Sequence, residues 1–123
     1  MLGHKGLKVF QLSYQLAMEI FHLTKKFPKE EVYSLTDQIR RSSRSVPANI
    51  AEAYRKRIYP KNFISKLSDA DGETSETQVW LEFSRDCNYI SAEKCNELLI
   101  RYEEVGKMIG GMMANPERFL PKK

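Results

Sequence analysis

The sequence predicts an all-α protein, an antiparallel up-down-up-down four-helix bundle in which residues 1–123 form one domain. The chain has 123 residues, of which 41% are hydrophobic and 29% charged, and this suits one folded domain rather than a disordered chain. Apolar residues recur every three or four positions, whereas the period of two that indicates strands is absent. Five prolines divide these stripes into four helix-sized segments, and short links make consecutive helices antiparallel.

The first helix is predicted over about residues 7–27 and is ended by Pro28, which cannot extend a helix. Its apolar face consists of Val9, Leu12, Leu16, Ile20, Leu23 and Phe27. Steps of three or four residues place side chains on one side of a helix. The segment therefore predicts an amphipathic helix whose apolar face joins the core.

The second helix is predicted over residues 34–57, where Ser34-Leu35-Thr36-Asp37 resembles a capping box with Asp in the place of Glu. Its apolar stripe consists of Leu35, Ile39, Val46, Ile50 and Ala53. Pro47 lies inside this stripe, and we expect a kinked but continuous helix. The alternative is a break, with Ser45 capping a new helix that starts near Val46.

The third and fourth helices are predicted over residues 60–87 and 91–113. Pro60 is a favourable first-turn residue for the third helix, and Ser91 is expected to cap the fourth. The third stripe consists of Phe63, Leu67, Ala70, Thr74, Thr77, Leu81 and Ser84. The fourth consists of Cys95, Leu98, Tyr102, Val105, Ile109 and Met112. The C-terminal tail that follows is expected to be loose.

Basic and acidic residues are segregated along the chain, although its formal net charge is only +4. Residues 36–66 carry eight basic side chains and two acidic ones, a net charge of +6. Residues 69–104 carry ten acidic side chains and three basic ones, a net charge of −7. Such segregation suits a surface for a polyanion, or pairing between oppositely charged helices.

The basic residues of the second helix are the candidate nucleic-acid-binding residues: Arg40, Arg41, Arg44, Arg55, Lys56 and Arg57. Separations of 4 and 11 residues between Arg40, Arg44 and Arg55 place these three on one helix face, from which they could contact phosphates. Alternatively, the arginines pair with acids of the third and fourth helices, within the bundle or across a subunit contact. Only Tyr54 and Tyr59 are expected near this face to stack on bases.

Four further residues stand out for structural reasons: Pro47, Asn49, Glu52 and Gly72. Pro47 frees the carbonyl of Ser43, and Asn49 and Glu52 follow one turn apart. These two side chains either satisfy the local backbone or a neighbouring helix, or order the nearby arginines. Gly72 lies inside the third helix, where glycine costs about 1 kcal/mol relative to alanine, and so predicts a close helix contact.

Catalytic, cofactor and metal sites are not predicted. A di-iron bundle needs two Glu-x-x-His motifs, but the chain has one, Glu19 to His22, and its other histidine, His4, precedes the first helix. Cys87 and Cys95 lack a flanking histidine and zinc-site spacing, so we expect reduced thiols. The sequence has no membrane-length apolar run and no signal-peptide pattern, which predicts a cytoplasmic protein.

Two segments of the second helix carry a family resemblance. Leu35-Thr36-x-Gln38-Ile39-Arg40-Arg41-Ser42, followed by Ser45-Val46-Pro47-Ala48-Asn49-Ile50-Ala51-Glu52, resembles the signature of the bacterial four-helix-bundle proteins encoded in 23S rRNA intervening sequences, often labelled S23 ribosomal proteins. Collinear matches outside these segments are Phe10, Ala17, Phe27-Pro28, Glu31, Phe63, Leu67, Ala70, Gly72 and Glu76. The chain departs from the family at Ala53, usually glycine, and at Glu73, commonly serine.

The resemblance implies a homo-oligomer, a pentamer, that is similar to the accessory variability protein of diversity-generating retroelements. That protein is a basic oligomer that binds nucleic acid and a reverse transcriptase. Carried over by position, Arg40, Arg41 and Arg44 are the first residues to test. The expected function is a non-enzymatic oligomeric scaffold that binds RNA or DNA through a basic face of the second helix. The alternative is a protein–protein interaction module with no nucleic-acid ligand.

Overall fold

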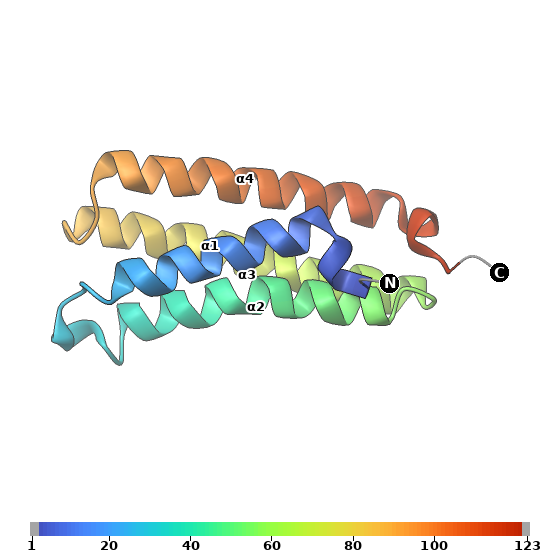
Figure 1. The fold of residues 1–123 in the computed structure, drawn as a ribbon, viewed down its shortest axis with the longest axis horizontal. Coiled ribbons are helices and arrows are strands. Elements are labelled where there is room, and N and C mark those ends of the chain that lie inside the picture. The colour runs from blue at the N-terminus through green and yellow to red at the C-terminus, as the bar shows by residue number, and fades with distance from the viewer. Residues whose placement is uncertain (1–2, 122–123) are drawn as a thin grey trace.

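The computed structural model describes residues 3–121, and within this range all regular secondary structure is helical. The main helices are α1 (Lys8–Thr24), α2 (Leu35–Arg55), α3 (Pro60–Asp86) and α4 (Ala92–Ala114). The short 3-10 helices are η1 (Gly3–Gly6), η2 (Lys29–Glu31) and η3 (Pro116–Phe119). Figure 1 shows consecutive main helices running in opposite directions, so the predicted all-α four-helix bundle is confirmed.

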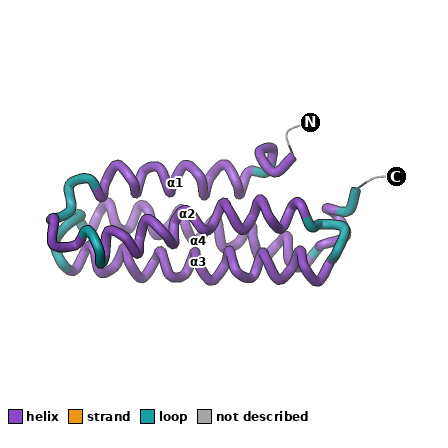
Figure 2. The backbone as a smooth tube through the Cα atoms, turned by 90° about the horizontal axis from the view of Figure 1, so that it is seen from below, coloured by secondary structure: helices purple, strands orange, loops and turns teal. Residues whose placement is uncertain are grey.

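Each main helix packs against its neighbours in the chain, and α4 returns beside α1 to close the bundle. Figures 1 and 2 together place α1 diagonally opposite α3, and α2 diagonally opposite α4. The contact between α2 and α3 is the most extensive, and the contact between α1 and α4 is the smallest of the four. The end of α1 lies beside the start of α2, because these two helices are antiparallel neighbours.

The core contains the residues that the apolar stripes predict. Its fully buried members include Leu16, Ile20, Ile39, Val46, Ile50, Phe63, Leu67, Leu81, Leu98, Tyr102, Val105 and Ile109. Leu12 and Leu23 of the predicted α1 face are only partly buried against this core. Between α2 and α3 the packed side chains are small and polar, and the Thr77 hydroxyl hydrogen-bonds to the Ser42 hydroxyl at 2.8 Å. Small residues at this seam let the two helices approach closely.

The helix boundaries lie within three residues of the prediction, and α2 continues unbroken through Pro47. The predicted cap at Ser91 is confirmed, because its hydroxyl accepts a hydrogen bond from the Lys94 amide at 2.9 Å. The predicted cap at Ser34 is wrong. Ser34 has φ −128° and ψ −109°, outside the extended conformation that a cap needs, and Glu31 Oε1 instead accepts from the Leu35 amide at 3.2 Å.

Packing corrects the expectation of a loose tail, and it bears on the contact expected at Gly72. The tail is not loose as far as it is described, because η3 folds back and the Phe119 ring lies 5.5 Å from the Phe63 ring. Gly72 is exposed, and no heavy atom lies within 4 Å of the position that a Cβ would take. Within residues 3–121, no close contact with another helix therefore requires glycine at this position, and a contact with another subunit stays a prediction.

Candidate nucleic-acid interface

The six basic residues predicted to bind nucleic acid lie in three different environments. Arg41 extends toward α3, whereas Arg40 and Arg44 extend toward α1. The remaining three, Arg55, Lys56 and Arg57, lie at the other end of α2. Neighbouring residues on a helix point in directions about 100° apart, so Arg40 and Arg41 meet different partner helices.

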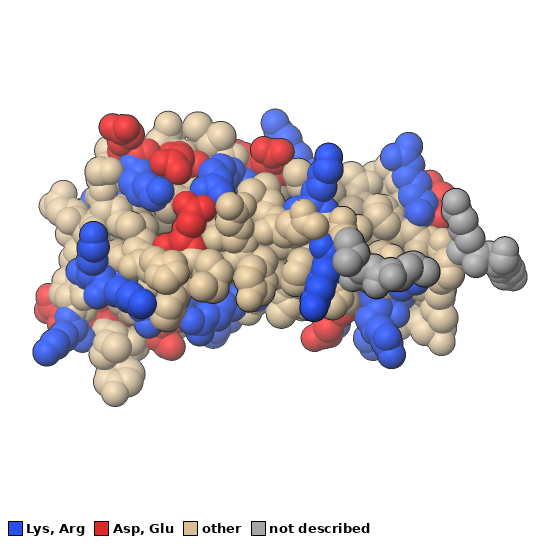
Figure 3. All heavy atoms as spheres, viewed as in Figure 1, with Lys and Arg blue, Asp and Glu red and all other residues tan. Residues whose placement is uncertain are grey.

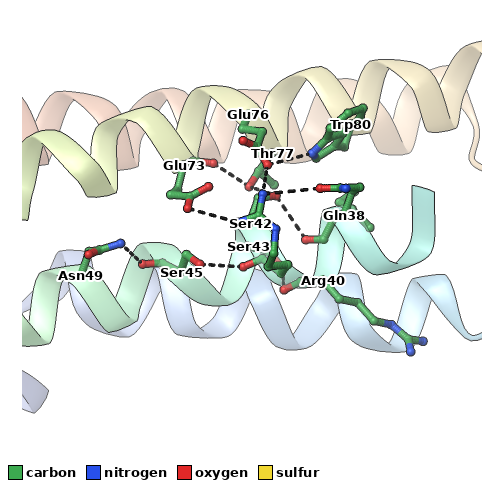
Figure 4. Close-up of polar contacts among 12 residues, drawn as sticks. Gln38, Arg40, Ser42, Ser43, Ser45, Asn49, Glu73, Glu76, Thr77 and Trp80 are labelled. Carbon is green, nitrogen blue, oxygen red and sulfur yellow. Dashed lines mark hydrogen bonds and ion pairs between the residues drawn. The ribbon is translucent and has the colours of Figure 1, made fainter. Parts of the chain in front are cut away.

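Arg41 is neutralised by carboxylates of α3. Its guanidinium lies 3.5 Å from Glu73 Oε2 and forms a shorter ion pair with Glu76. Glu76 also accepts a hydrogen bond from the Trp80 indole at 3.2 Å, and Gln38 accepts a hydrogen bond from Arg41 (Figure 4). Internal compensation, one of the two interpretations of the charge segregation, therefore describes Arg41, although half of its side chain stays exposed.

Arg40, Arg44 and Lys25 converge on the ring of Phe21 in α1. Their charged groups lie 4.9, 5.6 and 4.8 Å from the ring centroid, respectively. In residues 3–121, none of the three cations lies within 4.0 Å of a carboxylate oxygen. Figure 4 shows Arg40 extending away from α3. We call Lys25, Arg40, Arg44 and Phe21 the basic cluster.

The basic cluster holds unneutralised positive charge. Its three cations lie around one ring, so no two of them are more than about 11 Å apart. Because the screening length at physiological salt is about 8 Å, salt screens their mutual repulsion only in part. A cation–π contact at an exposed site contributes only about 0.5–1 kcal/mol. An anion that bridges these cations would relieve their mutual repulsion. Figure 3 shows basic side chains gathered over the end of α1 and along α2.

Arg40 is held in place by a chain of hydrogen bonds. Its Nε donates to the Thr24 hydroxyl at 2.8 Å, and that hydroxyl donates to the Phe21 carbonyl at 3.0 Å. Thr24 is buried at the last residue of α1, so the guanidinium of α2 is fixed by the neighbouring helix. A cation fixed in this way loses less side-chain freedom when it binds an anion.

Two adjoining hollows of about 540 and 510 Å³ lie beside the basic cluster and share Val32, Thr36 and Arg40. The first is also lined by Asp37, Arg41, Arg44, Ser45 and Ala48. The second is also lined by Thr24, Lys25, Phe27, Pro28 and Lys29. Asp37 is the one acid among these lining residues, against five cations. Thr36 is 5% exposed, and its hydroxyl has no hydrogen-bond partner within residues 3–121.

The sequence did not identify Phe21, Lys25, Lys29 or Thr36 as part of this surface. Phe21 and Lys25 are four residues apart in one helix, which brings their side chains together. The predicted antiparallel hairpin of the first two helices also places the end of one beside the start of the other. Combining these two signals would have found the α1 half of the basic cluster.

The second basic group lies at the opposite end of α2 from the first. The Arg57 guanidinium lies 4.2 Å from the centroid of the Tyr54 ring and donates to the Tyr54 carbonyl at 3.0 Å. The Tyr54 ring is thereby covered by Arg57, whereas Tyr59 is exposed. Arg55 and Lys56 are exposed at the end of α2.

Asn49 and Glu52 make structural contacts. The Asn49 amide donates to the Ser45 carbonyl at 2.9 Å within α2, and Glu52 pairs with Lys66 of α3 at 3.1 Å. Across residues 3–121, neither side chain forms a hydrogen bond or an ion pair with an arginine. Of the two roles considered for these residues, support of the local backbone and of a neighbouring helix agrees with these contacts.

The cysteines and acids form no reactive centre in the described part of the chain. Both thiols are free, with Cys87 exposed and Cys95 buried. Burial raises the pKa of the Cys95 thiol, which keeps it protonated and unreactive. Residues 3–121 contain no group of three or more His, Cys, Asp or Glu side chains arranged to hold a metal ion. Their helices also include none long and apolar enough to span a membrane.

Comparison with known proteins agrees with the resemblance found in the sequence. A crystal structure of a protein of unknown function from the S23 ribosomal protein family of Bacteroides thetaiotaomicron VPI-5482 superimposes with a TM-score of 0.77. The two chains are 30% identical, and the match covers 85% of this chain and 97% of that chain. No curated protein matches the chain significantly. A family model for 23S rRNA-intervening sequence proteins matches residues 5–111, so this chain belongs to that family.

Proposed function

We propose that this protein is a non-enzymatic, homo-oligomeric scaffold that binds RNA or DNA through phosphate contacts at the basic cluster. The observation that carries the proposal is the convergence of Lys25, Arg40 and Arg44 on one ring without a carboxylate partner. A nucleic-acid backbone supplies closely spaced negative charges, and its binding is favoured by the release of condensed counterions. Base identity plays no part in such contacts.

The proposed interface has a centre and a periphery. Lys25, Lys29, Arg40 and Arg44 form the centre, because they line the adjoining hollows and have no carboxylate within ion-pair distance in residues 3–121. Arg41 lies at the periphery, since a phosphate must compete with Glu73 and Glu76 for it. Arg55 and Lys56 lie about 16 Å beyond Arg44 along α2, because a helix rises about 1.5 Å per residue. They therefore contact only a strand long enough to span this distance.

The scaffold role rests on assembly of several copies, for which the family resemblance suggests a pentamer. Exposed apolar side chains offer surfaces for subunit contact, among them Phe83, Val79 and Ile100. Phe83 is 52% exposed and its ring lies 5.7 Å from that of Trp80. Light scattering is expected to give a mass several times that of the monomer. A monomeric mass at all protein concentrations contradicts the oligomeric part of the proposal.

The test of nucleic-acid binding compares two double variants that remove the same charge. Arg40→Ala/Arg44→Ala changes the basic cluster, and Lys61→Ala/Lys107→Ala removes two exposed lysines from α3 and α4. Fluorescence anisotropy with a labelled single-stranded RNA and its DNA equivalent is measured between 50 and 200 mM salt. We expect the arginine variant to reduce the slope of log affinity against log salt by about 1.4, as for the loss of two phosphate contacts.

The control variant should bind like the wild type, because its lysines lie outside the interface. Equal binding by all three proteins contradicts the assignment of the basic cluster. No binding by the wild type at physiological salt favours the alternative function, a protein–protein interaction module. That alternative would use the hollow of about 410 Å³ lined by Tyr33, Trp80 and Phe83, in which Tyr33 is 93% exposed.

A further inference from the structure

We propose that the two hollows beside the basic cluster contain a seat for one phosphate group that carries at most one ester, formed by Thr36, Arg40, Lys25 and Lys29. This inference rests on the proposed function and gives it a specific ligand, the terminal phosphate of a strand. Thr36 and Arg40 line both hollows, whereas Lys25 and Lys29 line the second. The seat therefore lies where the two hollows meet, at the end of α1 and the start of α2.

The Thr36 hydroxyl is the first argument for a bound anion. Thr36 is 5% exposed, and its Oγ1 has no hydrogen-bond partner in the described part of the chain, although buried polar groups in proteins are normally paired. A threonine in a helix populates two side-chain rotamers, and a change between them moves the hydroxyl to another side of Cβ. In the second rotamer the hydroxyl could donate to a phosphate oxygen in the hollow.

The Arg40 guanidinium is the second argument. Its Nε is used by the Thr24 hydroxyl, and within residues 3–121 its two terminal nitrogens have no hydrogen-bond partner. A planar guanidinium binds two oxygens of one phosphate through such a pair of nitrogens. Arg40 is anchored at Nε and packs over Phe21, so it offers this pair in a fixed orientation.

The charge and shape of the hollow favour a terminal phosphate over an internal one. A monoester carries a charge of about −1.5 to −2 near neutral pH, against −1 for an internal diester. Lys25, Lys29 and Arg40 supply three positive charges in the second hollow, and none of its lining residues is acidic. Phe27 and Pro28 form an apolar wall of this hollow. Their side chains carry no charge or hydrogen-bond donor for the next phosphate of a strand that continues past the hollow.

The experiment measures the affinity ratio between two forms of one short RNA, with a 5′-phosphate and with a 5′-hydroxyl. We expect the phosphorylated RNA to bind about tenfold more tightly to the wild type. Thr36→Val, which replaces the hydroxyl by a methyl of the same size, should bring the ratio close to one. Arg40→Lys, which keeps the charge but loses the paired nitrogens, should do the same. Ser75→Ala removes an exposed hydroxyl from α3 and should keep the wild-type ratio.

A parallel calorimetric titration with inorganic phosphate distinguishes the source of the ligand. Binding of one phosphate per chain that Thr36→Val weakens, without any preference for the phosphorylated RNA, assigns the same seat to the free anion. Equal phosphate affinity in wild type and Thr36→Val, together with an RNA ratio of one, overturns the seat.

The seat and the proposed function fail in different ways. If both RNA forms bind equally and bind more weakly at high salt, the seat is wrong while phosphate-backbone binding stands. If neither RNA form binds, the proposed function is wrong, and phosphate binding that depends on Thr36 still tests the seat. Circular dichroism confirms folding of Thr36→Val, which removes a hydroxyl without a partner and should not weaken the fold.

Discussion

Arg40 of α2 donates a hydrogen bond from Nε to the hydroxyl of Thr24, the last residue of α1, at 2.8 Å. This contact joins the two helices at the end of the bundle and holds the guanidinium over Phe21. The next residue, Arg41, pairs instead with Glu73 and Glu76 of α3. Two adjacent arginines thus have opposite electrostatic states, one available to an anion and one already neutralised.

Single alanine substitutions should separate these two arginines. Arg44→Ala is expected to weaken RNA binding about tenfold, the effect of losing one charge-assisted contact of about 1.4 kcal/mol. Arg41→Ala should weaken it much less, because Arg41 is already paired with α3. Anisotropy titrations at one fixed salt concentration compare the two. An equal or larger loss in Arg41→Ala contradicts the division between centre and periphery.

Removing one of the two carboxylates that pair with Arg41 should strengthen RNA binding. Glu76→Gln keeps the size of the side chain and leaves the Trp80 indole an oxygen to which it can donate. Arg41, which lines the first hollow, is then paired with Glu73 alone and is more available to a phosphate. Glu103→Gln, a change of the same charge at an exposed position on α4, is the matched control. An affinity for RNA that rises equally in both variants would reflect net charge alone.

The polar seam between α2 and α3 should contribute measurably to stability. Thr77→Val removes the hydrogen bond to Ser42 and leaves a buried hydroxyl with a poorer partner, at a cost of about 1–2 kcal/mol. In Thr77→Val/Ser42→Ala that hydroxyl is gone as well, so the loss should be smaller than the sum of the single effects. Urea unfolding measures the free energies. Additive losses would show that the two hydroxyls are not coupled.

Gly72→Ala should stabilise the protein by about 0.5–1 kcal/mol, because alanine is the better helix former and nothing within the chain obstructs a Cβ. Thermal and urea unfolding check the gain, and light scattering on the same variant checks the assembly. A loss of stability accompanied by a smaller mass would mean that another subunit packs against Gly72.

Acid should remove a contribution from Glu31. The pKa of Glu31 is lowered by the hydrogen bond from the Tyr89 hydroxyl at 2.8 Å, and next by that from the Leu35 amide. A carboxyl whose pKa is lower in the folded state stabilises the fold above its unfolded pKa, near 4.5, and loses this contribution as pH falls through the folded value. Urea midpoints of wild type and Glu31→Gln should therefore differ at neutral pH and converge in acid. A constant difference contradicts this linkage.

The same contact has an alkaline counterpart. The hydrogen bond to Glu31, followed by burial, raises the pKa of Tyr89 to about 12. A group with a raised pKa in the folded state stabilises the fold below its unfolded pKa, near 10, and loses this contribution as pH rises toward 12. Tyr89→Phe should remove a phenol with a pKa of about 12 from the ultraviolet absorbance titration. An unchanged titration curve would contradict the raised pKa.

Much of the fold was predictable because its causes are local in the sequence. Leu16, Ile50 and Phe63 are buried because a helix repeats every 3.6 residues, so their spacing alone places them on an inner face. Ser91 caps α4 through an amide three residues away. Ser34 has a similar sequence signature but fails to cap, because its backbone, with φ −128° and ψ −109°, lies outside the extended conformation that a cap needs.

The sequence by itself determined four amphipathic helices, their order and the concentration of positive charge on the second. Only the tertiary structure decided which positive charges are available. A side chain on a helix meets whichever helix lies on its side, so Arg40 meets Phe21 and Arg41 meets Glu76. Which helix lies on a given side of α2 depends on residues far away in the chain. Helix periodicity therefore predicts which residues are buried, whereas the electrostatic state of each surface residue is set by the packing of the bundle.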